Sequence, residues 1–106
     1  MSRDVRLYLE DILQSCQKIR RYTQGMSLEQ FRQDDRTFDA VIRILEIIGE
    51  AARNIPVETQ SSYPQVEWRS IAAFRNIVAH EYFGIKDEIV WDIVKNKIPE
   101  LYSALR

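Results

Sequence analysis

The segment from Asp34 to about Asn54 restricts the fold of this chain more than any other part of the sequence. Asp34 or Asp35 is placed to cap a helix, because a short acidic side chain accepts the free N–H groups of a first turn. The apolar residues that follow form two adjoining stripes of that helix: Phe38, Val41, Ile42, Leu45, Ile48, Gly49 and Ala52, and then Ala40, Ile44, Ile47 and Ala51. A helix that is apolar almost all round must be covered almost all round.

The cover for this long helix predicts how the protein assembles. The other helices of one chain can cover one broad face of it. The simplest cover for the remaining face is a second copy of the chain across a two-fold axis, so we expect a homodimer. The alternative is that Trp68, Trp91 and the C-terminal helix supply the cover within one subunit.

The rest of the sequence also favours helices, which end near most of the three glycines and three prolines. The first expected elements are a helix over about 3–24 ended by Gly25, a short helix opened by the capping box Ser27–Gln30, and the long helix. A connector between Pro56 and Pro64 follows, then a helix over about 66–82, and a last helix that is capped by Asp87 and kinked or split at Pro99. We therefore predict an all-α, up-and-down bundle of four to five helices, forming one domain over residues 1–106.

Composition excludes several classes of protein and site. The single cysteine, Cys16, excludes an intramolecular disulfide, and with one histidine in the chain it excludes a Cys/His zinc site within one subunit. No Asp/Glu cluster calls for magnesium, so we expect neither a metal nor a cofactor. No apolar run approaches the roughly 18 residues of a membrane span, and the N-terminus lacks the apolar stretch of a signal peptide. These features predict a cytoplasmic protein that does not enter the membrane.

The stretch Arg75–Tyr82 carries the chemistry of the sequence. His80 is the only side chain whose ordinary pKa allows proton transfer near neutral pH, and Arg75 offers a guanidinium that suits a phosphate oxygen. Ile71, Phe74 and Val78 would face the core of a regular helix, whereas Asn76 and His80 would face away from it. Asn76 lies one turn before His80, where an amide can orient an imidazole. A lone histidine on a helix is more often structural, but this one is not placed as a core residue.

The single histidine also limits the mechanism. Cleavage of RNA without a metal needs a base for the 2′-hydroxyl and an acid for the leaving 5′-oxygen. One chain has one imidazole, whereas a two-fold dimer has two, together with two Arg75 guanidiniums for the charge that grows on the phosphorane. The net charge of −1 gives the chain as a whole no attraction for RNA, so a basic surface must be local. Lys18–Arg21 is one candidate, and Arg69 with Arg75 is another.

The sequence Arg75-x-x-x-x-His80-x-Tyr82 resembles the R-x4-H-x-Y signature of the HEPN superfamily, and specifically its HepT-like toxins. The resemblance extends over nearly the whole chain. Ile48–Ala52 is similar to the family's IGEA segment, and Trp68–Ile71 precedes the motif at the family's spacing. The resemblance implies a HEPN-type helical bundle that forms a homodimer, with the two motifs in a shared cleft.

The resemblance also implies an activity and a partner. HEPN toxins cut RNA without a metal, so Arg75 and His80 would be catalytic and Asn76 supporting. HepT-like toxins accompany a minimal nucleotidyltransferase (MNT) antitoxin, which inactivates them by transferring AMP to the motif tyrosine, here Tyr82. An aryl phosphodiester two residues from His80 would repel an RNA backbone and fill the cleft.

Two functional classes remain open at this stage. The first is a metal-independent endoribonuclease toxin that acts on RNA. The second is a non-catalytic helical module that binds the MNT nucleotidyltransferase or a nucleotide and uses Arg75 and Tyr82 only as contacts. The net charge of −1 favours the second class, since most nucleic-acid binders show a basic surface. The intact Arg, Asn, His and Tyr set favours the first, because a scaffold needs no general base.

Overall fold

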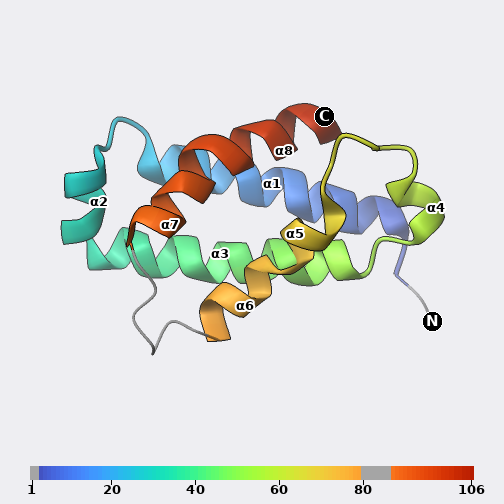
Figure 1. Ribbon diagram of the computed structural model, residues 1–106, viewed down its shortest axis with the longest axis horizontal. Coiled ribbons are helices and arrows are strands. Elements are labelled where there is room, and N and C mark those ends of the chain that lie inside the picture. The colour runs from blue at the N-terminus through green and yellow to red at the C-terminus, as the bar shows by residue number, and fades with distance from the viewer. Residues whose placement is uncertain (1–2, 80–86) are drawn as a thin grey trace.

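The structure is a computed structural model that describes residues 3–79 and 87–106 (Figure 1). These residues form helices and connecting segments, with no strand among them, so the predicted all-α bundle is confirmed. The elements are α1 (Val5–Thr23), α2 (Leu28–Gln33), α3 (Asp35–Arg53), α4 (Val57–Gln60), α5 (Trp68–Ala72), α6 (Phe74–Ala79), α7 (Asp87–Asp92), the π-helical turn η2 (Ile93–Lys97) and α8 (Ile98–Leu105). Within the described ranges, no helix is both long enough and apolar enough to cross a membrane.

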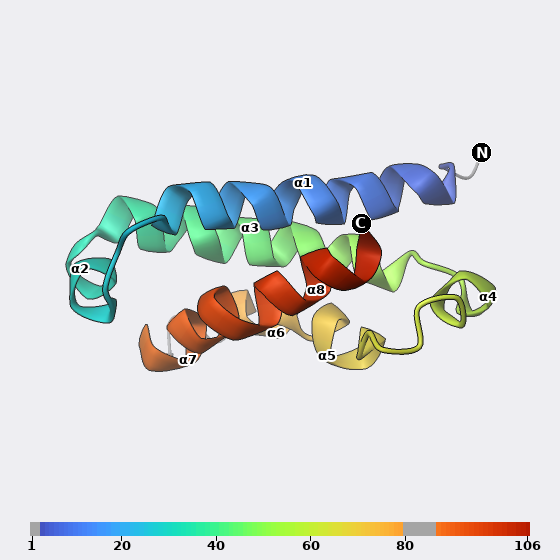
Figure 2. The same cartoon turned by 90° about the horizontal axis from the view of Figure 1, so that it is seen from above.

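Helices α1 and α3 lie side by side and run in opposite directions along the length of the molecule (Figures 1 and 2). Helices α5 and α6 pack on α3, and α8 packs on α1. The core lies between these helices, where several side chains have no exposed surface: Ile12, Cys16, Ile19, Val41, Leu45, Ile48, Val90 and Ile98. Burying each of the isoleucine, valine and leucine side chains in this set contributes roughly 1.5–3 kcal/mol to folding.

The first half of the fold follows the predicted caps closely. Ser27 and Gln30 form the predicted capping box, in which the Ser27 hydroxyl accepts from the Gln30 N–H at 3.1 Å and the Gln30 side chain accepts from the Ser27 N–H at 2.8 Å. Asp34 ends α2 and also caps α3, where its carboxylate accepts from the Thr37 N–H at 3.0 Å. The hydrogen bonds that the N–H and the hydroxyl of Thr37 donate to Asp34 hold the pKa of the Asp34 carboxyl below its usual value. Gly25, with φ of 76°, closes α1 in the left-handed conformation that glycine adopts readily.

The second apolar stripe of α3 is covered mostly within one chain. Ile44 and Ala51 are only 6% and 5% exposed, whereas Ile47 is 37% exposed. Trp68 is buried, and Trp91 contacts Phe31 with ring centroids 5.0 Å apart. Cover within a single subunit therefore accounts for most of this stripe, although the C-terminal helix α8 packs on α1, and the helices that pack on α3 include α5, which carries Trp68. The two apolar stripes of α3 alone give little support to a homodimer, which stays a prediction.

Two predicted elements differ in detail from the structure. The connector between Pro56 and Pro64 contains the short helix α4. The predicted helix over 66–82 is broken at Ala73, where the Asn76 N–H donates to the Ala73 carbonyl at 2.8 Å, three residues back rather than four. Apolar periodicity does not reveal this tightened turn, because Ile71 before it and Phe74 after it are both buried as predicted. Residues 80–82 of that predicted helix lie outside the described residues.

The last helical region is divided before Pro99, in agreement with the predicted kink or split. Helix α7 includes Asp87 as its first residue rather than beginning after it as a cap. The π-helical turn η2 then separates α7 from α8, and Pro99 occupies the first turn of α8. A proline has no N–H and its ring collides with the carbonyl four residues back, so a wider turn upstream removes that collision.

Candidate functional site

Arg75 lies on α6, and its side chain is 48% exposed. Asn76, the next residue, is also exposed. The exposure of Asn76 agrees with the expectation that this residue faces away from the core, and Phe74 is buried as expected. His80 and Tyr82, the other predicted site residues, lie outside the described residues, as does Val78's side chain. The structure therefore places the Arg75 and Asn76 half of the predicted site.

Gly49 of α3 determines how closely Arg75 approaches the long helix. A Cβ atom built on Gly49 would lie 2.9 Å from the backbone nitrogen of Arg75 and 3.2 Å from its Cβ. It would also lie 3.1 Å from the carbonyl oxygen of Ala72, next to the break between α5 and α6. Any side chain at this position would therefore push α6 away from α3. The glycine lets the backbone of Arg75 rest directly on the long helix.

Glu50, the next residue on α3, reaches the Arg75 side chain. The Glu50 Oε2 atom lies 3.4 Å from Nη1 of Arg75 and 3.9 Å from Nη1 of Arg53. One carboxylate is thus shared between a guanidinium on its own helix and the guanidinium of the motif. All three side chains are about half exposed, at 48% for Arg75, 56% for Glu50 and 52% for Arg53.

Arg75 stands at the edge of a groove of about 540 Å³, which we call the Arg75 groove. Its lining residues come from α1, α3 and α6 and from the segment before α1: Arg3, Tyr8, Asp11, Arg43, Glu46, Ile47, Glu50, Ala51 and Arg75. Ile47, the exposed residue of the second apolar stripe, is among them. The groove therefore contains the part of α3 that one chain leaves uncovered, beside the motif arginine.

Each arginine of the Arg75 groove is paired with a carboxylate. Arg3 donates to Asp11 at 2.6 Å and lies over the Tyr8 ring, 4.8 Å from its centroid. The hydrogen bond to Asp11 raises the pKa of the Arg3 guanidinium. Arg43 pairs with Glu46 one turn further along α3, as Arg75 pairs with Glu50. Three guanidiniums and three carboxylates line the groove, so its formal charge is balanced.

The chemistry that this arrangement supports is contact with an oxyanion. A guanidinium carries five N–H donors in a rigid fork, and the ion pair to Glu50 is formed at Nη1 of Arg75, 3.4 Å from Oε2. The remaining donors of a half-exposed Arg75 can bind two oxygens of a phosphate. Among the described residues, no group of three or more His, Cys, Asp or Glu side chains is arranged to hold a metal ion.

The other basic segment singled out from the sequence lies away from Arg75. Arg20 is over the ring of Tyr102, 5.4 Å from its centroid, and Arg21 is over Tyr22 at 5.5 Å. Neither arginine lines the Arg75 groove. Arg69 is exposed on α5, but it does not line the groove either. The structure thus groups Arg75 with Arg3 and Arg43 instead of with Arg69, its predicted partner in a basic surface.

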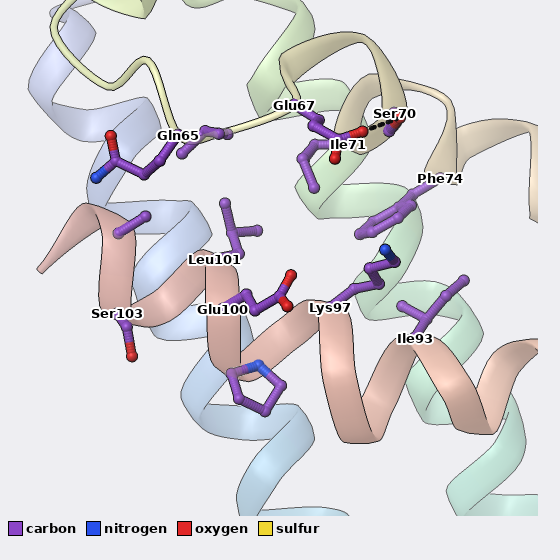
Figure 3. A pocket seen from close by; sticks show the side chains of 13 residues that line it. Gln65, Glu67, Ser70, Ile71, Phe74, Ile93, Lys97, Glu100, Leu101 and Ser103 are labelled. Carbon is purple, nitrogen blue, oxygen red and sulfur yellow. Dashed lines mark hydrogen bonds between the residues drawn. The ribbon is translucent and has the colours of Figure 1, made fainter.

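A second cavity, of about 820 Å³, lies between α5 and α6 on one side and η2 and α8 on the other (Figure 3). Its wall is mainly apolar and includes Ile71, Phe74, Ile93 and Leu101. Lys97 points toward Phe74 across the cavity, while Ser70 donates to Glu67 at 3.5 Å on the rim (Figure 3). Arg75 does not line this cavity, so the two hollows are separate.

Sequence reasoning missed Glu50, Arg3 and Arg43 as neighbours of the motif. Glu50 and Arg75 are 25 positions apart, and no spacing rule connects residues on different helices. The available signal was Gly49, because a glycine within a strongly helical apolar stripe often marks a close backbone approach. That signal identifies a crossing point on α3 without naming the segment that crosses there.

Comparison with known proteins agrees with the fold. The family described as "Ribonuclease HepT-like" matches residues 12–106. A Methanocaldococcus jannaschii protein named as a putative RNase is 47% identical over 97 residues, which cover 92% of this chain and 80% of that protein. A Thermococcus cleftensis protein named as a probable ribonuclease HepT is 42% identical over 101 residues, which cover 95% and 92% of the two chains. No solved structure matches this chain significantly. From the family match and these identities, the chain belongs to the HepT-like ribonuclease family, within the HEPN superfamily.

Proposed function

We propose that this protein is a metal-independent endoribonuclease that acts as the toxin of a HEPN/MNT toxin–antitoxin system in the cytoplasm. The observation that carries the proposal is the placement of the motif arginine. Arg75 of α6 is half-exposed, its backbone rests against α3, and its side chain lines a groove. The chain that places it so belongs to the HepT-like ribonuclease family. Arg75 would contact the scissile phosphate, and His80, five residues later, would exchange the protons.

The proposed reaction is an internal transesterification. A general base removes the proton of the 2′-hydroxyl, the 2′-oxygen attacks phosphorus, and the bond from phosphorus to the 5′-oxygen breaks. A general acid protonates the leaving 5′-oxygen, so the products are a 2′,3′-cyclic phosphate and a 5′-hydroxyl. The His80 side chains of two subunits supply the base and the acid. Arg75 stabilises the charge that grows on the phosphorane oxygens, and Asn76 supports the imidazole.

The homodimer is part of this proposal, because one chain contains one histidine. The uncovered side chain of Ile47 beside Arg75 supports an interface near the Arg75 groove. Sedimentation at micromolar concentration should therefore give about twice the mass of one chain, since stable homodimers dissociate at lower concentrations. A folded monomer under these conditions would remove both the dimer and the shared site.

A metal-free cleavage assay tests the proposed activity. Wild type should cut a labelled RNA in the presence of EDTA, and His80→Ala should cut it about 10²–10⁴-fold more slowly, because the proton transfer is lost. Arg75→Ala should weaken both binding and turnover. Arg75→Lys should recover part of the loss, since an ammonium carries the charge without the bidentate fork. The circular dichroism of each variant should match wild type, which shows that the fold is retained.

Inactivation of the toxin is proposed to occur at Tyr82. A cognate MNT nucleotidyltransferase would transfer AMP from ATP to the phenolic oxygen of Tyr82 and release pyrophosphate. Incubation with that enzyme, ATP and Mg²⁺ should add one or more AMP units, seen as mass shifts in the peptide that contains Tyr82. Tyr82→Phe should block the modification and keep RNA cleavage, because only the acceptor oxygen is lost. If the antitoxin neutralises Tyr82→Phe as well as wild type, inhibition occurs by another route.

A second candidate function is a non-catalytic module that binds the nucleotidyltransferase or a nucleotide. The balanced charge of the Arg75 groove and the net charge of −1 favour this alternative, because neither attracts an RNA backbone strongly. The cleavage assay separates the two candidates. RNA cleavage by His80→Ala at the wild-type rate, or none by wild type, would support the binding module.

A further inference from the structure

Glu50 is the only carboxylate within ion-pair distance of Arg75 among the described residues. We propose that Glu50 is a positioning residue for Arg75, which holds the guanidinium in the orientation from which it contacts the RNA phosphate. This inference rests on the proposed ribonuclease function, in which Arg75 stabilises the reacting phosphate. It adds a residue of the long helix to a site that the motif alone assigns to α6 and the residues after it.

The first support is the way in which the backbone fixes the pair. Gly49 brings the backbone nitrogen of Arg75 so close to α3 that a Cβ atom on Gly49 would lie 2.9 Å from it. The Arg75 side chain therefore begins at a fixed point on α3, one residue away from Glu50. Only the flexible part of the arginine remains to be ordered, and Glu50 contacts that part, 3.4 Å from Nη1.

The second support is the geometry of the contact. Arginine has large rotamer freedom, so an exposed guanidinium without a partner samples many positions. Glu50 contacts Nη1 of Arg75, and the half-exposed guanidinium has further donors that can bind a phosphate. Glu50 is itself restrained by Arg53, with 3.9 Å between Oε2 and Nη1. The three side chains together carry a formal charge of +1, so the site keeps a positive charge despite the carboxylate.

These contacts predict opposite effects of Glu50 on the two kinetic constants. Loss of the carboxylate lets the Arg75 guanidinium move away from the reacting phosphate, and misplacement of a reacting group by about 1 Å can lower a rate by up to about 10²-fold. The same change makes the groove more positive by one charge, which favours RNA binding. A positioning role therefore predicts a lower kcat with an unchanged or lower KM. Simple screening of Arg75 by Glu50 predicts a higher kcat/KM instead.

The experiment is a steady-state cleavage assay with a short labelled RNA on wild type, Glu50→Gln and a matched control, Glu46→Gln. Glu46 lies one turn earlier on α3 and pairs with Arg43 instead of Arg75. Both substitutions replace a carboxylate by an amide of the same shape and change the net charge equally. We expect Glu50→Gln to lower kcat about 10-fold without raising KM, and Glu46→Gln to lower KM while kcat stays within twofold of wild type. An equal fall in kcat for both variants, or a wild-type kcat for Glu50→Gln, overturns the proposal.

A second arm tests whether Glu50 acts through Arg75. In the Arg75→Ala background, Glu50→Gln should change the residual cleavage rate by less than twofold, because the side chain that it positions is gone. A further 10-fold loss in that background would mean that Glu50 acts on something else, and the proposal would fail.

A structural readout keeps the inference testable when cleavage is absent. The Nε–Hε NMR signal of Arg75, identified by its loss in Arg75→Lys, should show restricted motion in wild type and free motion in Glu50→Gln, but not in Glu46→Gln. Wild-type protein that does not cleave RNA contradicts the proposed function alone, whereas an Arg75 signal that is equally mobile in wild type and Glu50→Gln contradicts the positioning role.

Discussion

Substitution of Gly49 by alanine should separate activity from stability. The added Cβ would lie 2.9 Å from the Arg75 backbone nitrogen and 3.1 Å from the Ala72 carbonyl oxygen, both of which belong to backbone that cannot rotate away. Ordinary contacts begin near 3.4 Å, so α6 must withdraw from α3 by roughly 0.5 Å. Overpacking of this kind costs about 1–3 kcal/mol. Replacing a helical glycine by alanine returns about 0.5–1 kcal/mol.

The two effects leave Gly49→Ala less stable by about 1 kcal/mol, which corresponds to a fall in Tm of roughly 4–8 °C for a domain of this size. Withdrawal of α6 carries Arg75 away from Glu50, so kcat for RNA cleavage should fall by about 10-fold or more. Thermal unfolding and the metal-free cleavage assay measure the two quantities on the same preparation. The expected signature is a protein that is folded at the assay temperature but cleaves RNA about 10-fold or more slowly than wild type.

Gly25→Ala is the matched control, because it makes the same chemical change at a place where a Cβ meets nothing within 4 Å. Its cost comes from the left-handed backbone at φ of 76° and is about 1–2 kcal/mol. Gly25→Ala should therefore lose similar stability and keep its cleavage rate. A Gly49→Ala protein that is as stable and as active as wild type would refute the close approach of α6 to α3. Equal loss of activity in both variants would show that stability alone is responsible.

Three further measurements test other parts of the structure. Burial raises the pKa of the Cys16 thiol to about 12 from an ordinary 9.0, so native protein should react with a thiol reagent at pH 8 far more slowly than unfolded protein, and fast labelling of folded protein would contradict this burial. Because that folded pKa is raised, the stability that Cys16 contributes should be present below pH 9 and be lost as the pH rises toward 12, which urea unfolding at several pH values can measure. Ser27→Ala, which removes the hydroxyl of the capping box, should lower the unfolding free energy by about 1 kcal/mol, and an unchanged value would mean that the cap contributes nothing to stability.

Much of the fold follows from local sequence rules, because its helices begin and end at residues with strong local preferences. Asp34 caps α3, Gly25 closes α1 and Pro99 lies at the division of the last helix, each by a mechanism that acts within a few residues. The burial of Ile71 and Phe74 also follows from the helical period. The break at Ala73 does not, since it lies where α5 and α6 cross α3 at Gly49, and a crossing is set by tertiary packing.

The site was predicted in its residue types but not in its surroundings. Asn76 is exposed, as the helical period predicted, and Arg75, for which the period made no such prediction, is exposed as well. The partner of Arg75 is Glu50, a polar residue of α3 that is distant from the motif in the sequence. Ile44 and Ala51 show the same limit, because the helices that cover them within the chain cannot be assigned from α3 alone. Contacts between distant segments depend on tertiary packing. The sequence pattern of one segment does not show which other segment will pack against it.

The π-helical turn at Ile93–Lys97 lies between α7 and α8. A π turn holds about one residue more than an α turn, so this segment takes up one surplus residue. Deleting one residue here, such as Asn96, would remove the surplus and leave the same side of α8 toward the core. A deletion within α8 would instead rotate the residues after it by about 100° and turn Leu105 away from the core. The turn therefore lets the chain change by one residue in length without changing the register of the C-terminal helix.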